Sequence, residues 1–285
     1  MSTTIDTTDV PTPPSGPGAG LVPVSPRGGE LRAAITSEST KLRSVRSTVW
    51  TLFATITATV GIGALIAFAR TSRWSDMSRF DQLRFDSTAA SLRGVYLAQI
   101  ALGVLGVLVI SSEYSTGMIR TTLTAIPRRI TVLTAKVLVF AVVAVVVSLV
   151  ACFVAFGVGQ SIFASKGANA SLSDPGVLRA VLGSAYYLTA IGLVGVALGT
   201  LLRRTAGAIA TLFGLVLVLP ALASALPSPW NTDVGKFTPS GAGTAVFAVR
   251  SQSDLLSPGA GMAVLAGYVI VGLALAAFAL NRRDA

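Results

Sequence analysis

The sequence predicts an all-α, polytopic membrane protein with six transmembrane helices. Hydrophobic residues make up 52% of the 285 positions and charged residues only 12%, with a mean hydropathy of +0.73. A soluble domain carries about a quarter charged residues. Six stretches of about 19 to 29 residues lack Asp, Glu, Lys and Arg, and a bilayer core of about 30 Å needs about 20 helical residues. These stretches do not alternate in polarity, so they favour helices over a β-barrel.

Before the first stretch, the chain divides into a tail and the start of the membrane domain. Residues 1–29 are rich in Thr, Pro, Ser and Gly, a composition that buries too little apolar surface to repay ordering. We expect a disordered cytoplasmic tail there and a membrane domain over residues 30–285. Between Glu30 and Arg46, apolar residues recur near helical spacing among basic ones, which predicts a helix lying at the membrane surface. A plain positive flank that fixes topology is the alternative.

Each charge-free stretch is long enough to cross the bilayer once. The fifth is expected to end its helix near Leu226, because Pro227 and Pro229 follow. The sixth is expected to begin its helix near Gly261, after Pro258 and Gly259. The six stretches are Ser47–Ala69, Gly94–Ser112, Val137–Ser165, Ala180–Leu202, Thr205–Thr232 and Leu255–Asn281.

The distribution of Lys and Arg predicts the orientation of the chain. With six spans both ends share one side, and that side carries 13 Lys and Arg residues against 9 on the other. The positive-inside rule therefore places both termini in the cytoplasm, although five arginines between residues 70 and 93 argue the other way. The Ala, Val, Gly and Arg bias further suggests a bacterial chain, and hence the bacterial plasma membrane.

Small and aromatic residues inside the stretches predict how the helices pack. Gly195 and Gly199 form a G-x-x-x-G pattern near Gly192, and the second stretch holds Gly103 and Gly106. Such glycines allow close approach of helices, and packing within the chain is preferred to a dimer seam. Tyr186 and Tyr187 lie near the start of a span and are interpreted as interfacial anchors, with substrate binding as the alternative.

The connection between the second and third stretches, Ser111–Lys136, is the most informative segment. Glu113 is the only acidic residue between Asp86 and Asp174, and Gly117 can break the chain direction. Beyond it, apolar residues recur at i, i+4 and i+7, which predicts a short amphipathic helix. That helix would carry Ile119, Leu123 and Ile126 on one face, Arg120 on the other, and would end at Pro127, Arg128 and Arg129. An ordinary positively charged loop is the alternative.

The stretch E-Y-S-T-G-M-I-R-T-T-L-T-A-I-P-R-R, with Lys136 at the head of the next span, resembles the ABC-2 type transporter permease family. The segment from Glu38 to Arg46 is similar to that family's N-terminal interface helix, and Phe237–Gly243 resembles its last extracellular loop. The resemblance implies six helices, a homodimer or heterodimer of permease subunits, and separate cytoplasmic ATPase subunits. It also implies a loop that couples ATPase motion to the spans, formed by Glu113, Tyr114, Gly117, Ile119, Arg120, Leu123, Pro127, Arg128 and Arg129. In the interface helix it points to Glu38, Lys41, Arg43 and Arg46.

What the sequence lacks excludes other functions. There is no histidine and no P-loop, since Gly235-Lys236 is followed by Phe237. We therefore expect no enzyme activity, no cofactor and no metal in this chain. The net charge is +10, but the Lys and Arg residues lie mostly between the apolar stretches and at their edges. This distribution is typical of membrane flanks and argues against nucleic acid as a partner.

Two other functions stay open beside the permease. An ion-coupled secondary transporter is the main alternative, although the six stretches hold no ionisable residue for proton coupling. Sodium sites built from hydroxyl and carbonyl oxygens remain compatible with the sequence. A membrane scaffold without transport is the third possibility. The absence of charge in the spans favours a lipid-like or drug-like cargo for an exporter.

Overall fold

The computed structural model of the chain describes residues 27–118, 121, 124, 128–249 and 254–282. The described elements are helical: α1 (Arg27–Ser44), α2 (Arg46–Ser72), η1 (Trp74–Asp76), α3 (Arg79–Arg84), α4 (Ser87–Ser91), α5 (Val95–Ser115), α7 (Arg129–Ala164), α8 (Val177–Leu202), α9 (Thr205–Phe213), η2 (Gly214–Val218), α10 (Leu219–Ser224), α11 (Trp230–Gly235), α12 (Pro239–Phe247) and α13 (Pro258–Arg282). Of these, η1 is a short 3₁₀ helix and η2 is a π-helical turn. The predicted tail falls almost wholly outside the described residues, and α1 begins three residues before the predicted boundary at Glu30.

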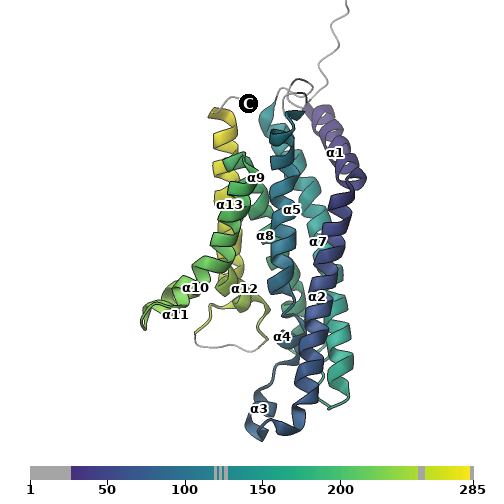
Figure 1. Cartoon of the computed structure of the whole chain (residues 1–285), viewed down its shortest axis with the longest axis vertical. Helices are drawn as coiled ribbons and strands as arrows, with labels where there is room; N and C mark the ends of the chain where they lie inside the picture. The colour runs from purple at the N-terminus through teal and green to yellow at the C-terminus, as the bar shows by residue number, and fades with distance from the viewer. Residues whose placement is uncertain (1–26, 119–120, 122–123, 125–127, 250–253, 283–285) are drawn as a thin grey trace, which may run out of the picture.

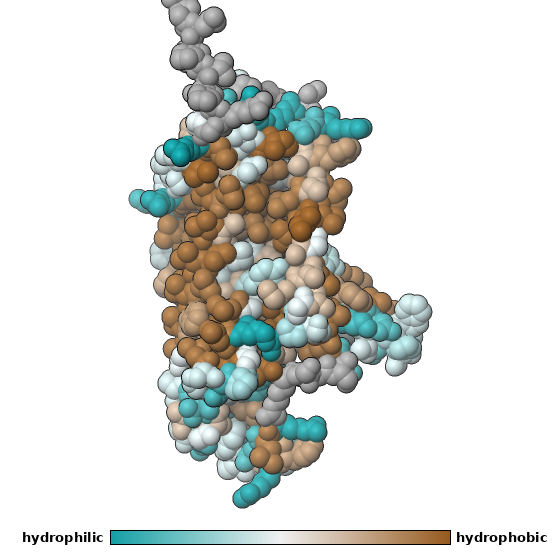
Figure 2. All heavy atoms as spheres, turned by 180° about the vertical axis from the view of Figure 1, so that it is seen from behind, coloured by the Kyte–Doolittle hydropathy of each residue, from teal (hydrophilic) through white to brown (hydrophobic). Residues whose placement is uncertain are grey.

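Six helical segments are long and apolar enough to cross a membrane, as predicted. They are α2, α5, α7, α8, the continuous segment Thr205–Ser224 (α9, η2 and α10) and α13. They form an elongated bundle (Figure 1). Figure 2 shows an apolar belt around the middle of the visible face, with polar residues gathered toward the two ends.

The two ends of the bundle differ in what they carry. The start of α1 and the end of α13 lie at one end, here called the terminal end (Figure 1). The short helices α3 and α4 lie at the opposite end, here called the loop end, with α12 also toward that side. An even number of spans requires this arrangement. That the terminal end faces the cytoplasm remains a prediction.

Helix α8 occupies the centre of the bundle. In its most apolar stretch 78% of the residues are buried, against 17% in α13. Its closest neighbour is α5, because glycines on each helix face the other backbone. A Cβ atom on Gly106 would collide with the carbonyl of Gly192, and one on Gly195 with the carbonyl of Gly103. These contacts confirm the prediction that the glycines serve packing within the chain.

Several helix boundaries differ from the predicted ones. Helix α7 begins at Arg129, eight residues before Val137, because a charge marks the limit of what lipid tolerates and not the limit of a helix. The sixth span begins at Pro258 and not near Gly261. There the Ser257 hydroxyl accepts from the Ala260 amide at 3.3 Å, and proline suits a first helical turn. The fifth span ends at Ser224, two residues before the predicted Leu226.

The predicted N-terminal helix is present but shorter at its end. Helix α1 stops at Ser44 because Val45 is extended, with φ −82° and ψ 108°. Arg46, predicted as part of the interface helix, is therefore the first residue of α2, and that assignment was wrong. Helix α1 packs against α7. Its location at a membrane surface stays a prediction.

Candidate functional site

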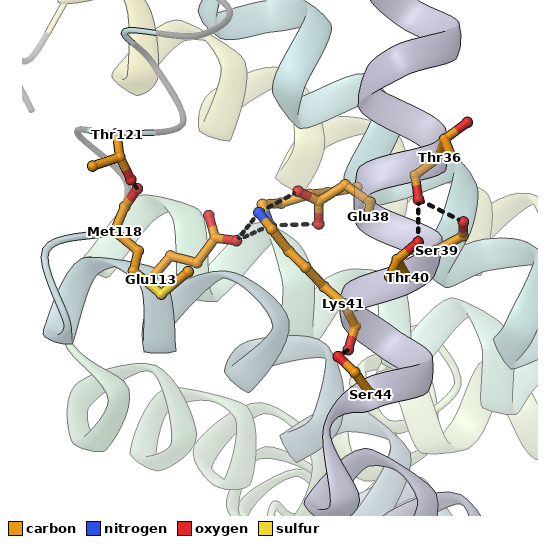
Figure 3. A network of polar contacts seen from close by, with 10 residues as sticks. Thr36, Glu38, Ser39, Thr40, Lys41, Ser44, Glu113, Met118 and Thr121 are labelled. Atoms are coloured by element: carbon orange, nitrogen blue, oxygen red, sulfur yellow. Dashed lines mark hydrogen bonds and ion pairs between the residues drawn. The ribbon is translucent and has the colours of Figure 1, made fainter.

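Four buried or half-buried charges meet at the terminal end of the bundle. Glu113 Oε1 accepts from Lys41 Nζ at 2.9 Å and from Lys136 Nζ at 2.7 Å. Glu38 receives the same two cations, Lys41 at Oε1 (3.0 Å) and Lys136 at Oε2 (2.7 Å). Figure 3 shows the labelled side chains of Glu38 and Lys41 from α1 converging with Glu113 from α5. We call Glu38, Lys41, Glu113 and Lys136 the charged cluster.

Local helical geometry explains why these residues meet. On α1, Leu31, Ala34, Glu38 and Leu42 follow one helical stripe, and this stripe turns toward the bundle because Ala34 and Glu38 are both buried. Glu38 thus occupies a position where the pattern calls for an apolar residue. Glu113 lies in the last turn of α5, and Lys136 lies two turns inside α7.

Burial makes mutual pairing necessary in this cluster. Lys136 is 1% exposed, and Glu38 and Glu113 are 4% and 6% exposed. Unpaired charges at such positions are strongly destabilising, whereas paired and hydrogen-bonded charges are tolerated. Burial alone would lower the pKa of Lys41, but the hydrogen bonds and negative charges of Glu113 and Glu38 raise it above its usual value. The cluster therefore joins α1, α5 and α7 as one electrostatic unit.

The loop after α5 leaves the cluster through a tight turn. Gly117 has a φ of +73°, the left-handed conformation that suits glycine just past a helix end. One residue after Glu113, the Tyr114 ring lies 5.2 Å from the Arg203 guanidinium, which follows α8. The turn at Gly117 and the contact of Tyr114 with Arg203 together determine the position at which the loop begins after α5.

The far side of the same loop is also anchored at the terminal end. Arg128 lies 3.5 Å from Glu30 of α1. Arg129 Nη1 donates to the Leu280 carbonyl at 3.0 Å, near the end of α13, where a cation suits the exposed carbonyls of a helix. Both ends of the connection between α5 and α7 are thus attached to other helices.

The structure brings together part of the predicted site. Glu38, Lys41 and Glu113 share the charged cluster, whereas Arg43 and Arg46 are exposed and lie outside it. The predicted amphipathic helix rests on residues that lie outside those described, namely Ile119, Arg120, Leu123, Ile126 and Pro127. Their roles stay predictions.

Lys136 was missed as a member of the site. The available signal was the position of the two charges in the sequence. Lys136 directly precedes the longest charge-free stretch, and Glu113 directly follows the charge-free stretch before it. Helices α5 and α7 extend past those stretches, so both residues lie on spanning helices. Ionisable residues in such positions face the bundle interior and pair with one another. The sequence-based argument that the spans lack ionisable groups therefore no longer counts against an ion-coupled transporter.

A second polar cluster toward the loop end carries no charge. The Tyr187 hydroxyl donates to Gln99 Oε1, Gln99 Nε2 donates to the Tyr96 carbonyl at 2.8 Å, and the Tyr96 and Thr244 hydroxyls are 2.6 Å apart. We call Tyr96, Gln99, Tyr187 and Thr244 the neutral cluster. Tyr187 is fully buried, so its prediction as an interfacial anchor was wrong. It lies almost three turns inside α8, deeper than the charge-free stretch suggested. Tyr186 is partly exposed.

The fold and the charged cluster define a multi-pass membrane protein whose terminal end is organised around one inter-helix loop. A family described as "ABC-2 family transporter protein" matches residues 34–221. The chain belongs to this family, and it is a membrane subunit of an ABC transporter. Family membership, and not the composition of the spans, is the observation that bears on the choice between the permease and the ion-coupled alternative. No curated protein sequence matches the chain.

Proposed function

We propose that the chain is the permease of an ATP-driven exporter in a bacterial plasma membrane. It works as a homodimer or heterodimer with separate cytoplasmic ATPase subunits, and both of its termini face the cytoplasm. The cargo is a lipid-like or drug-like molecule. The segment Glu113–Arg129 receives the movement of the ATPase and passes it to the spans.

The charged cluster is the observation that carries this proposal. Glu113 lies at the start of the segment, and Lys136 lies two helical turns beyond its end. The two residues pair with each other, and each also pairs with a residue of α1. A force applied to the segment therefore acts on α5, α7 and α1 together. Because α1 leads through Val45 into α2, the same force reaches the first span.

The position of Glu113 changes the role expected of it. The resemblance places Glu113 in the loop that couples to the ATPase, but its carboxylate is buried against two lysines. Glu113 is therefore proposed as a positioning residue that holds the loop to α1 and α7. Arg128, whose side chain is half exposed, is better placed for contact with a soluble subunit.

The apolar surface supports a membrane-embedded, paired arrangement. Large side chains on α2 point away from the bundle, with Trp50 at 70% and Phe68 at 67% exposure. Helix α13 exposes Ile270 and Phe278 in the same way. Such faces suit lipid or a second permease subunit.

Affinity isolation of the tagged chain from its own membrane tests the proposal. A Walker-motif ATPase is expected to co-purify, and its hydrolysis rate should change when the permease is present. Glu113→Gln should retain membrane insertion and the ATPase but lose this change in rate. Glu30→Gln on α1, whose carboxylate lies 3.5 Å from the exposed Arg128, is the matched control and should behave as the wild type.

Arg128→Glu provides a second variant whose folding does not depend on the charged cluster. It should weaken co-purification of the ATPase while the thermal unfolding midpoint falls only slightly, because the pair with Glu30 contributes little. Isolation of the chain without any nucleotide-hydrolysing partner, or normal ATPase response in both Glu113→Gln and Arg128→Glu, would contradict the proposal.

A further inference from the structure

A cavity of about 310 Å³ lies beside the charged cluster, between α1, the start of α2 and the last three turns of α5. Glu38, Lys41, Glu113 and Lys136 all contribute to its wall. Most of the remaining wall is apolar, formed mainly by Leu42, Val45, Leu105, Leu108 and Val109. The cavity therefore combines one polar region with an apolar channel, the composition that suits an amphiphile.

Glu113 lines the cavity and has one carboxylate oxygen without a hydrogen-bond partner among the described residues, and this oxygen has almost no accessible surface of its own. Both lysines bond to Oε1, while Oε2 is buried and has no hydrogen-bond partner among the described residues. A buried carboxylate oxygen without a donor is unfavourable, and native structures rarely leave one. The polar region of the cavity is therefore suited to a ligand that donates a hydrogen bond.

The charge of the cluster limits what kind of donor fits. Two lysines and two glutamates balance, and each carboxylate already faces both cations. A cationic head would add an uncompensated positive charge beside two lysines, and an anionic head would compete with the glutamates for them. A neutral hydroxyl donor satisfies Oε2 without disturbing this balance.

The apolar wall sets where the rest of the ligand lies. Leu105 and Glu113 are eight residues apart on α5, or about 12 Å along the helix at 1.5 Å per residue. At the rim, Val45 and Met118 are 45% and 48% exposed. A hydrocarbon chain entering from the membrane can thus lie along α5 while its head reaches the charged cluster.

We propose that this cavity binds a membrane-borne amphiphile with a neutral, hydroxyl-bearing head, such as a monoacylglycerol, through a hydrogen bond to Glu113 Oε2 once that carboxylate turns toward the cavity. The acyl chain lies against Leu105, Leu108 and Val109. This inference goes beyond the proposed function, because binding needs neither nucleotide nor an ATPase subunit. It therefore stands or falls separately from the coupling role of the loop.

Photo-crosslinking of the purified full chain in phospholipid nanodiscs tests the site. Three probes share one diazirine-bearing acyl chain and differ only in the head: a monoacylglycerol, a fatty acid and an alkylamine. Peptide mass spectrometry should place the monoacylglycerol label on residues 105–109. Its labelling should exceed that of the other two by about tenfold, the effect of one hydrogen bond to a charged group.

Leu108→Trp fills the channel and should reduce labelling about tenfold. Val45→Trp at the rim should also reduce labelling, and it provides a test that leaves the interior of the bundle unchanged. Leu97→Trp, on the same helix but outside the cavity wall, is the matched control and should label as the wild type. Equal labelling by all three probes would show that only the acyl chain is recognised, or that water satisfies Oε2. Either result would overturn the proposal. Preferential labelling by the amine would also overturn it, in favour of a cation site.

Discussion

Helix α5 carries a polar cluster near each of its ends, and the two clusters use different chemistry. At its end, Glu113 belongs to the charged cluster, which joins α1, α5 and α7. Near its start, Gln99 belongs to the neutral cluster, which joins α5, α8 and α12. The two residues are 14 positions apart, or about 21 Å along the helix.

The difference shows what each end can withstand. A neutral hydrogen bond can be lost at the cost of one unsatisfied group, whereas a buried charge that loses its partner is destabilised far more. The charged cluster therefore moves as a unit or not at all, while the neutral cluster can loosen one bond at a time. This contrast suits an end that receives force and an end that rearranges locally.

The largest expected effect comes from Lys136→Met. The substitution keeps the length of the side chain but leaves Glu38 and Glu113 buried with Lys41 as their remaining cation in the cluster. Breaking a buried pair in this way costs about 3–5 kcal/mol. The thermal unfolding midpoint in mild detergent should fall sharply, together with the yield of monodisperse protein.

Lys166→Met is the control for that experiment. Lys166 is exposed, so its replacement should leave the midpoint unchanged. A Lys136→Met protein that unfolds with the wild type would show that the two clusters do not differ as proposed.

Tyr187→Phe measures the neutral cluster in the same assay. It removes the hydroxyl that donates to Gln99 and leaves that amide oxygen buried without its partner. The free energy of unfolding should fall by about 1–2 kcal/mol. Tyr186→Phe removes a hydroxyl that bonds the Met262 carbonyl in an exposed setting, and should change stability by less than about 0.5 kcal/mol. Equal effects of the two variants would argue against a structural role for the neutral cluster.

The pH dependence of stability tests the contribution of Lys41 to the charged cluster. Its pKa is raised in the folded chain above the ordinary value of 10.5, so the folded state binds this proton more tightly than the unfolded state. The resulting stabilisation is fully present below pH 10.5 and is lost as pH rises through the higher folded pKa. Melting curves between neutral and strongly alkaline pH should fall more steeply for the wild type than for Lys41→Met. Parallel curves would contradict the assigned pairing.

The smallest effect is expected for Arg128→Gln. The Arg128 and Glu30 side chains are 50% and 19% exposed and lie 3.5 Å apart. Such pairs contribute at most about 0.5 to 1 kcal/mol, and salt screens them. A small loss of stability at low ionic strength should disappear at high salt. An undiminished effect at high salt would place this pair with the charged cluster.

The six spans could be predicted because lipid penalises every charge along a helix. The same reasoning failed at the boundaries, since α7 carries Lys136 inside it once two carboxylates compensate the charge. Glycine spacing predicted close packing, and the structure shows which helix each glycine faces.

The charged cluster could be predicted only in part. The acid in the loop was identified from its isolation in the sequence, but its pairing with Lys136 and with Glu38 depends on tertiary packing. Glu38 and Lys136 are 98 residues apart, and no helical period connects them. The neutral cluster could not be predicted from the sequence, because glutamine and tyrosine occur in spans without any distinctive spacing.

The distance between Glu38 and Lys136 along the chain also orders events during synthesis. Glu38 leaves the ribosome 98 residues before its partner, which is roughly 5 to 20 seconds at the usual pace of translation. Until the third span follows, Glu38 of α1 and Glu113 of the second span have Lys41 as their nearby counter-charge. Helix α1 can therefore reach its final position only after about half of the polypeptide has been made. A nascent chain that is interrupted before that point lacks the ion pair between Glu38 and Lys136.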